Sequence, residues 1–267
     1  MRELLMEIYK RLYHAYGPRH WWPGETPFEV MVGAILTQNT SWINVEKAIR
    51  RLKEEGHLTV TGIHQLKKSK LASLIRSSGT YRIKADRLRV FTTFLFETYG
   101  GKISRMKKDP ARALRDRLLG VKGIGPETAD SILLYALGKP VFVVDAYTRR
   151  ILSRHGIISE KASYEEVQQL FMDHLPADER LFNEYHALLV YLGKRVCQKT
   201  PKCDICPLES IGHGAEGKEE KKYFCLWFLL YAPCPMLYAG LIDGLLGKRD
   251  PESHGQGDPS VWIDRRR

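Results

Sequence analysis

The sequence is poor in cysteine, has fewer acidic than basic residues, and begins without the uninterrupted apolar core of a signal peptide. Residues 1–17, MRELLMEIYKRLYHAYG, are amphipathic and charged throughout, so we do not expect export. Acidic residues number 31 against 42 lysines and arginines, giving a net charge of +11. This charge favours a polyanionic partner, although basic ribosomal and membrane-surface proteins share it. Three of the five cysteines cluster at positions 197, 203 and 206, which in a reducing cytoplasm favours metal or iron–sulfur ligation over disulfide bonds.

Hydrophobic residues make up 43% of the chain, enough for one large or two small cores. Apolar residues recur at helical spacing through most of the sequence, and we predict an all-α fold. Capping patterns mark several helix starts: Thr26 with Pro27 and Glu29, Ser163 with Glu166, and Asp178. The helices predicted before the first glycine-rich turn cover residues 2–16, 27–39, 42–55, 64–77, 81–98 and 110–119.

Residues 119–137 predict a helix, a tight hairpin and a second helix. Gly120, Gly123 and Gly125 interrupt an otherwise helical stretch, and Pro126 is well suited to the first turn of the next helix. Backbone N–H groups and the helix dipole at such a turn both favour an anion, so a phosphate would fit there.

A lone aspartate follows the hairpin. Asp145 ends the apolar run VFVVD, and a carboxylate at the end of such a run needs an explanation. It could be a functional group, or it could cap the helix that begins with AYTRRIL, since Asp is a favoured N-cap residue. The two roles are compatible.

These motifs resemble the helix-hairpin-helix DNA glycosylase superfamily, of which endonuclease III is the familiar member. The match extends with gaps from about residue 27 to residue 206. It implies a six-helix domain over 27–137 and a second helical domain from 1–26 plus 138–212. Composition marks 213–267 as a linker and an atypical apolar tail, which the family lacks. The resemblance also implies that Lys122, Gly123 and Gly125 contact the phosphates of double-stranded DNA and that Asp145 is catalytic.

Two further segments match the family. ILTQNTSWINVEKA resembles the helix whose glutamine fills the space left by an extruded base, so Gln38 would be the wedge. The alternative is that Gln38 caps its helix. GTYRIKADRL resembles a segment near the DNA minor groove, which places Lys84 near phosphate; the alternative is a solvated basic face.

The base pocket is predicted at Trp21 and Trp22, which could form an aromatic wall for a cationic base or simply pack in the core. HWWP and ILTQNTSW resemble the endonuclease III-related 3-methyladenine DNA glycosylases. Bifunctional family members carry a lysine where this chain has Glu127. A carboxylate cannot form an imine, so the resemblance predicts a monofunctional glycosylase for N-alkylated purines. A bifunctional glycosylase/lyase for oxidised pyrimidines and a non-catalytic DNA-binding module are the alternatives, and Glu127 could merely complement the helix dipole.

The cysteine cluster resembles the start of the family's iron–sulfur loop. Cys197, Cys203 and Cys206 match the first three ligands, but the fourth position is Gly212. We expect a [4Fe–4S] cluster with an unidentified fourth ligand; the alternative is a loop that has lost its metal. Beyond it, residues 223–242 form a run of 20 residues without a charge. Its length permits a membrane span, but two prolines interrupt it, and we expect a cytoplasmic, nucleoid-associated monomer without membrane contact.

Overall fold

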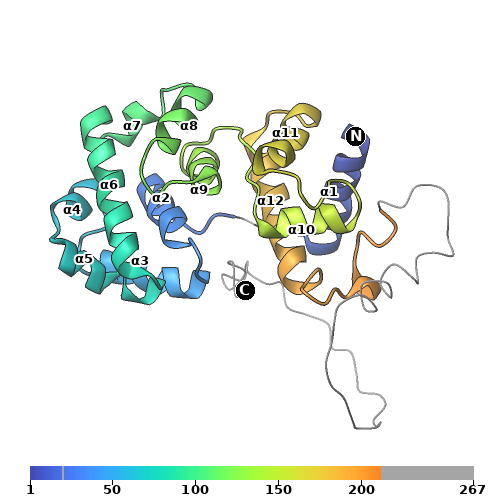
Figure 1. Cartoon of the computed structure of the whole chain (residues 1–267), viewed down its shortest axis with the longest axis horizontal. Coiled ribbons are helices and arrows are strands. Elements are labelled where there is room, and N and C mark those ends of the chain that lie inside the picture. The colour runs from blue at the N-terminus through green and yellow to red at the C-terminus, as the bar shows by residue number, and fades with distance from the viewer. Residues whose placement is uncertain (20, 212–267) are drawn as a thin grey trace, which may run out of the picture. The chain divides into compact units, whose positions relative to one another are not determined.

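The computed structural model of the chain describes residues 1–19 and 21–211, and all regular elements in these ranges are helices. The all-α prediction is therefore confirmed. The α-helices, labelled in Figure 1, are α1 (Arg2–Tyr16), α2 (Pro27–Leu36), α3 (Trp42–Glu54), α4 (Val60–Gln65), α5 (Lys68–Leu74), α6 (Tyr81–Tyr99), α7 (Ile103–Met106), α8 (Ala111–Leu119), α9 (Pro126–Ser131), α10 (Ala146–Arg154), α11 (Tyr164–His174) and α12 (Glu179–Arg195). Short 3-10 turns cover Arg76–Ser78 and Cys203–Ile205, and a π-helical turn, Ile132–Ala136, continues α9.

Two hydrophobic clusters hold these helices together. The first is built by α2 to α9 around α2, in which every residue after Pro27 is buried. The second is built by α1, α10, α11 and α12, with Leu5, Ile8 and Leu12 of α1 buried as their spacing predicts. Trp21 and Tyr135 are partly buried against both clusters, so these two aromatic side chains lie where the clusters adjoin.

The predicted helix over 64–77 is wrong, because the structure has two shorter helices there. Thr59 starts α4 by accepting a hydrogen bond from the backbone N–H of Gly62 at 2.9 Å. Leu66 is extended and separates α4 from α5. The capping residue lies upstream of the predicted start, so the real helix begins earlier.

The helix that carries Gln38 also ends earlier than predicted. The Thr37 hydroxyl donates to the carbonyl of Gly33 at 2.8 Å, and Asn39 takes a left-handed conformation with φ 55°. Helix α2 therefore stops at Leu36, and Gln38 lies in the turn that follows.

The apolar run before Asp145 is an irregular connection. Phe142, Val143 and Val144 are buried, and Phe142 stacks on Phe171 with ring centroids 3.7 Å apart. This packing fixes the chain directly before α10, and so it fixes the position of Asp145.

No helix within the described ranges is both long and apolar enough to cross a bilayer. The uncharged run 223–242, the linker before it and Gly212 lie outside the described residues.

Candidate active site

Asp145 is the N-cap of α10, and its two carboxylate oxygens have different surroundings. Oδ1 accepts a hydrogen bond of 2.7 Å from the backbone N–H of Thr148. Oδ2 is buried without a hydrogen-bond partner, and Asp145 as a whole is only 2% exposed. One oxygen therefore holds the helix, while the other keeps its capacity to accept a proton or a hydrogen bond.

His186 of α12 lies beside this free oxygen. Its Nε2 is 3.8 Å from Asp145 Oδ2, and the side chain is 4% exposed. On the other side of the ring, Nδ1 is hydrogen-bonded to the hydroxyl of Tyr135. Burial lowers the pKa of His186, and the Asp145 carboxylate opposes that shift. In the sequence His186 lies among apolar residues and has no histidine at ligand spacing, which favours a structural role. The structure places it next to Asp145.

The glycine hairpin joins α8 to α9, and the side chain of Gln38 is hydrogen-bonded to it. The Gln38 side-chain amide donates to the carbonyl of Gly123 at 3.1 Å and to the hydroxyl of Thr128 at 2.9 Å. Arg87 of α6 donates to Gln38 Oε1. Gly123 has φ 91°, and a Cβ there would lie 2.6 Å from Arg87 Cγ. The positive φ and the lack of room for a Cβ both require glycine at position 123.

An aromatic wall stands next to Gln38. Trp22 packs on Tyr135 with centroids 4.9 Å apart and meets Trp42 edge-on. Its indole lies against Gly33 of α2, where a Cβ would be 3.3 Å from the ring. The absence of a side chain at Gly33 therefore lets Trp22 approach the helix.

These groups surround one pocket with a volume of about 600 Å³. It is lined by Trp22, Ala34, Thr37, Gln38, Asn39, Arg87, Gly123, Ile124, Gly125, Pro126, Glu127, Thr128, Ser131, Val143, Tyr164 and His186. Asp145 adjoins the pocket through His186. Trp21 does not line it and instead packs against Trp22.

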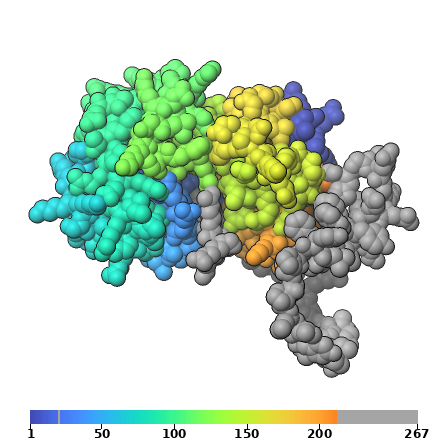
Figure 2. All heavy atoms as spheres, in the orientation of Figure 1, coloured from blue at the N-terminus to red at the C-terminus, as the bar shows by residue number. Residues whose placement is uncertain are grey.

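A buried carboxylate fixes the wall of the pocket near the hairpin. Asp130 of α9 is fully buried and accepts two hydrogen bonds from Arg115, of 2.7 and 2.9 Å. It also accepts from Tyr164 and Gln168 of α11, both at 2.8 Å. Figure 2 shows the green side chains of α8 and α9 meeting the yellow side chains of α11 on this face. No sequence motif pointed to this network, because its members are far apart in the chain.

Residues 32–177, more than half of the chain, match the sequence profile of the HhH-GPD superfamily of base excision DNA repair proteins. The chain belongs to this superfamily. The resemblance inferred from the hairpin and Asp145 is thereby confirmed.

Full-length relatives extend the match. A candidate DNA repair glycosylase of Methanocaldococcus jannaschii is 50% identical over 210 residues, spanning 78% of this chain and 96% of the relative. Endonuclease III of Thermotoga maritima is 31% identical over 211 residues, spanning 79% and 91%. A solved structure of H. pylori 3-methyladenine DNA glycosylase bound to 1,N6-ethenoadenine is 30% identical, with a TM-score of 0.63, and the match covers 72% of this chain and 95% of that one. This HhH-GPD protein is a DNA N-glycosylase.

Glu127 occupies the first turn of α9 in this glycosylase and lines the pocket. Its charge contributes to raising the pKa of both Tyr135 and Tyr164, although burial is the larger cause for each. The carboxylate thus faces the same space as the aromatic wall.

Lys84, which its motif predicted near phosphate, is buried and directed into the protein. It is 1% exposed, and its ammonium donates to the backbone carbonyls of Leu36, at 2.8 Å, and Ser78. Burial, with a smaller contribution from Arg87, lowers its pKa to about 8. A signal was present in the sequence, because Lys84 lies on the same helical stripe as Leu88 and Leu95.

Within the described residues, the cysteine loop does not gather into a metal-binding group. Nowhere in residues 1–19 and 21–211 do three His, Cys, Asp or Glu side chains converge on a point where a metal ion could sit. Cys197 is buried and receives a contact of 3.3 Å from Arg154 Nη1, and burial raises the pKa of the Cys206 thiol. Cys203 is partly buried. A cluster needs four thiolates or substitutes, and Gly212, the fourth position, lies outside the described residues.

Arginines of α10 hold this loop instead. Arg150 Nη2 donates to the carbonyls of Gly193 and Cys197, each at 2.7 Å. Arg154 donates to the carbonyls of Gln198 and Lys199. These contacts attach the loop to the helix that Asp145 caps.

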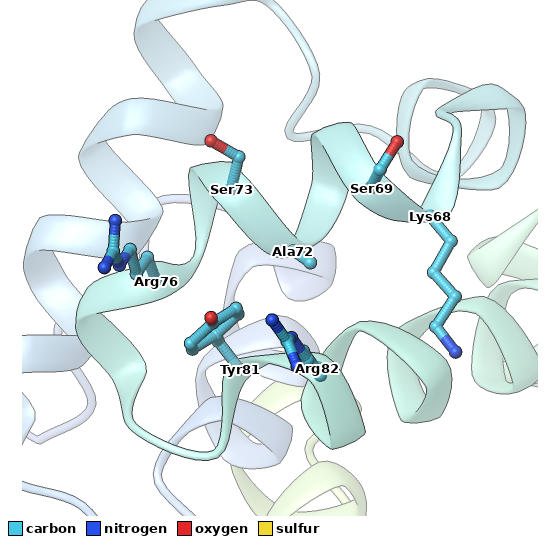
Figure 3. A pocket seen from close by; sticks show the side chains of 7 residues that line it. All are labelled: Lys68, Ser69, Ala72, Ser73, Arg76, Tyr81 and Arg82. Atoms are coloured by element: carbon cyan, nitrogen blue, oxygen red, sulfur yellow. The ribbon is translucent and has the colours of Figure 1, made fainter.

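A second pocket, also about 600 Å³, lies between α5 and the start of α6. It is lined by Lys68, Ser69, Ala72, Ser73, Arg76, Tyr81 and Arg82. Figure 3 shows Tyr81 and Arg82 opposite Ala72. Lys68 Nζ lies 2.6 Å from Asp86 Oδ1, so one of the positive charges that line this pocket is already paired.

Proposed function

We propose that this DNA glycosylase is monofunctional and removes N-alkylated purines such as 3-methyladenine. The observation that carries the proposal is Glu127 in the wall of the pocket beside His186 and Asp145. The resemblance places the attacking lysine of bifunctional members at this position, and no lysine is among the residues that line the pocket. Without an amine there is no Schiff base, and base removal leaves an intact abasic site.

The substrate class follows from the pocket wall. An N-alkylated purine carries positive charge, which weakens its glycosidic bond and attracts it to an indole face by roughly 0.5 to 2 kcal/mol. Trp22 provides such a face, and Trp21 meets its ring in an edge-on contact. Similarity to the H. pylori 3-methyladenine DNA glycosylase supports the same class.

DNA engages the hairpin and the turn after α2. Lys122 is exposed on the hairpin, next to Gly123 and Gly125, and these three residues meet the phosphate backbone. Gln38 is held against the same hairpin. It enters the duplex as the wedge that replaces the extruded base, which offsets part of the cost of unstacking.

Base release requires stabilisation of positive charge on the sugar while the electrons of the N-glycosidic bond leave with the base. The Asp145 carboxylate, with Oδ2 free of hydrogen bonds, stabilises that charge and accepts the proton of the attacking water. The oxygen that caps α10 keeps the carboxylate oriented during the reaction.

The test uses duplex DNA carrying methylated purines, oxidised pyrimidines or mismatches. We expect release of the methylated base, strand cleavage only after alkali, and no covalent adduct with borohydride. Efficient borohydride trapping on oxidised pyrimidines would instead establish a bifunctional enzyme, which the similarity to Thermotoga maritima endonuclease III favours. Tight binding without any base release would indicate a non-catalytic DNA-binding module.

The [4Fe–4S] cluster stays a prediction that rests on the resemblance, because the described cysteines do not converge on a metal position. Iron and sulfide analysis of anaerobically purified protein, with the absorption near 400 nm, decides it. None of the chemistry at Asp145 depends on the cluster.

A further inference from the structure

We propose that His186 and Asp145 together hold the attacking water, between His186 Nε2 and Asp145 Oδ2. The inference rests on the proposed function and assigns a part in it to a residue outside the family motifs discussed above.

The two atoms are spaced for a shared water molecule. They are 3.8 Å apart, which is too long for a direct hydrogen bond. At this separation a single water oxygen can lie about 2.8 Å from both atoms. Both side chains are more than nine-tenths buried, and neither of these two atoms has a hydrogen-bond partner. Buried polar atoms are rarely left unpaired, and His186 lines the pocket that would receive the base.

The proton arrangement on the imidazole suits this role. Next to the Asp145 carboxylate, a proton on Nε2 is favoured over a lone pair, because the lone pair would face negative charge. Nδ1 then accepts, and the Tyr135 hydroxyl donates to it. Burial and the nearby Asp145 carboxylate raise the pKa of Tyr135 well above its ordinary value, so the hydroxyl keeps its proton. His186 Nε2–H can therefore donate to a water oxygen.

The step balances without another reactant. The water donates one hydrogen bond to Asp145 Oδ2 and accepts one from His186 Nε2–H, which leaves a lone pair for the sugar carbon. As the carbon–nitrogen bond breaks, its electron pair leaves with the cationic purine, which departs neutral. A carbon–oxygen bond forms from water, and the water's proton passes to Asp145.

Substitutions at His186 test this arrangement in single-turnover base release from methylated duplex DNA. His186→Leu removes the donor, and we expect a loss of about 100-fold in rate, at the lower end for positioned acid–base groups. Its affinity for a duplex carrying an abasic-site analogue should be unchanged. His186→Gln restores an N–H near the Nε2 position and should recover most of the rate. His174→Leu on α11, whose ring bonds only to its own helix, is the matched control and should behave as wild type.

The outcomes separate the two proposals. If His186→Leu releases base at the wild-type rate while Asp145→Asn is inactive, the water site is wrong and the proposed function stands. If Asp145→Asn itself releases base normally, the proposed function fails. If His186→Gln is as slow as His186→Leu, or if DNA affinity falls in parallel with rate, His186 only packs the site and the inference is overturned. Should His186→Leu not fold, Tyr135→Phe takes its place, because it removes the donor that keeps the proton on Nε2: a slower rate is expected, and a wild-type rate would overturn the inference.

Discussion

At the scale of single residues, the two oxygens of Asp145 separate its structural role from its proposed chemical one. Oδ1 accepts from the Thr148 N–H and Oδ2 faces His186. A neutral amide can still cap a helix through its oxygen, since Asn is as good an N-cap as Asp. Structural and chemical contributions at this position can therefore be separated by substitution.

We expect Asp145→Asn to keep its fold and lose base release. Its free energy of unfolding should change by less than about 1 kcal/mol, because the cap is retained, whereas Asp145→Leu loses the cap as well. Denaturant unfolding and base release, measured on the same preparations, check this. A large loss of stability in Asp145→Asn would show that the charge itself, rather than the cap, holds α10.

Lys84 is a buried cation satisfied by two backbone carbonyls. We expect Lys84→Met to lower the free energy of unfolding by about 3 kcal/mol, because the carbonyls of Leu36 and Ser78 lose a charged donor. The pKa of Lys84 is about 8 in the folded protein, below the ordinary value of about 10.4. Between these two pH values the folded state therefore binds fewer protons at Lys84 than the unfolded state does. Wild-type stability should therefore gain from Lys84 as pH rises through this window, and Lys84→Met should lack that gain.

Denaturant unfolding at several pH values measures both effects of this substitution. Arg82→Ala is the control, since Arg82 is exposed on the same helix, and its stability should stay close to wild type at each pH. Equal stability of Lys84→Met and Arg82→Ala would contradict the structural role.

At the scale of elements, α6 meets the glycine hairpin through Arg87. Its guanidinium donates to Gln38 Oε1, and Gly123 leaves room for its aliphatic part. Arg87 thus orders Gln38, the proposed wedge, from a helix that does not itself belong to the hairpin.

We expect Arg87→Ala to slow base release by about 10-fold, because small misplacements of positioning groups have effects of this size or more. The defect should shrink when the damaged base lies opposite an abasic site, where extrusion costs less. Single-turnover rates on the two duplexes, with Arg82→Ala as the matched control, measure it. An equal defect on both duplexes would place Arg87 in a later step than extrusion.

Capping residues in the sequence predicted where helices start, but the sequence did not predict which distant side chains lie together. The caps at Thr26, Ser163 and Asp178 form as predicted, because a cap is decided within one turn. The hairpin and Asp145 could also be located, because their motif is contiguous. The approach of His186 to Asp145 could not be predicted, since it depends on how α10 packs against α12 through Gly193 and Tyr147.

At the scale of the whole molecule, an excess of basic charge makes DNA affinity depend on salt. A net charge of +11 accounts for attraction to any duplex but does not identify the residues that touch phosphate. Arg150 illustrates this, since its guanidinium is committed to backbone carbonyls of the cysteine loop.

We expect Lys122→Ala to reduce the slope of log affinity against log salt by about 1, as for the loss of one phosphate contact. Lys10→Ala, an exposed lysine on α1, carries the same change in charge and should leave the slope unchanged. Titration of fluorescent duplex DNA at several salt concentrations provides the slopes. Equal slopes for the two variants would mean that Lys122 acts only through net charge.

The Lys84 ammonium holds the carbonyl of Leu36, the last residue of α2, two positions before Gln38. A buried cation thus holds the end of the helix that precedes Gln38, the proposed wedge, while the hairpin and Arg87 hold the Gln38 side chain itself. As pH rises past about 8, Lys84 loses its charge while the surface arginines keep theirs. Above this pH the end of α2 is held by a neutral amine, while the positive charge that attracts DNA is retained.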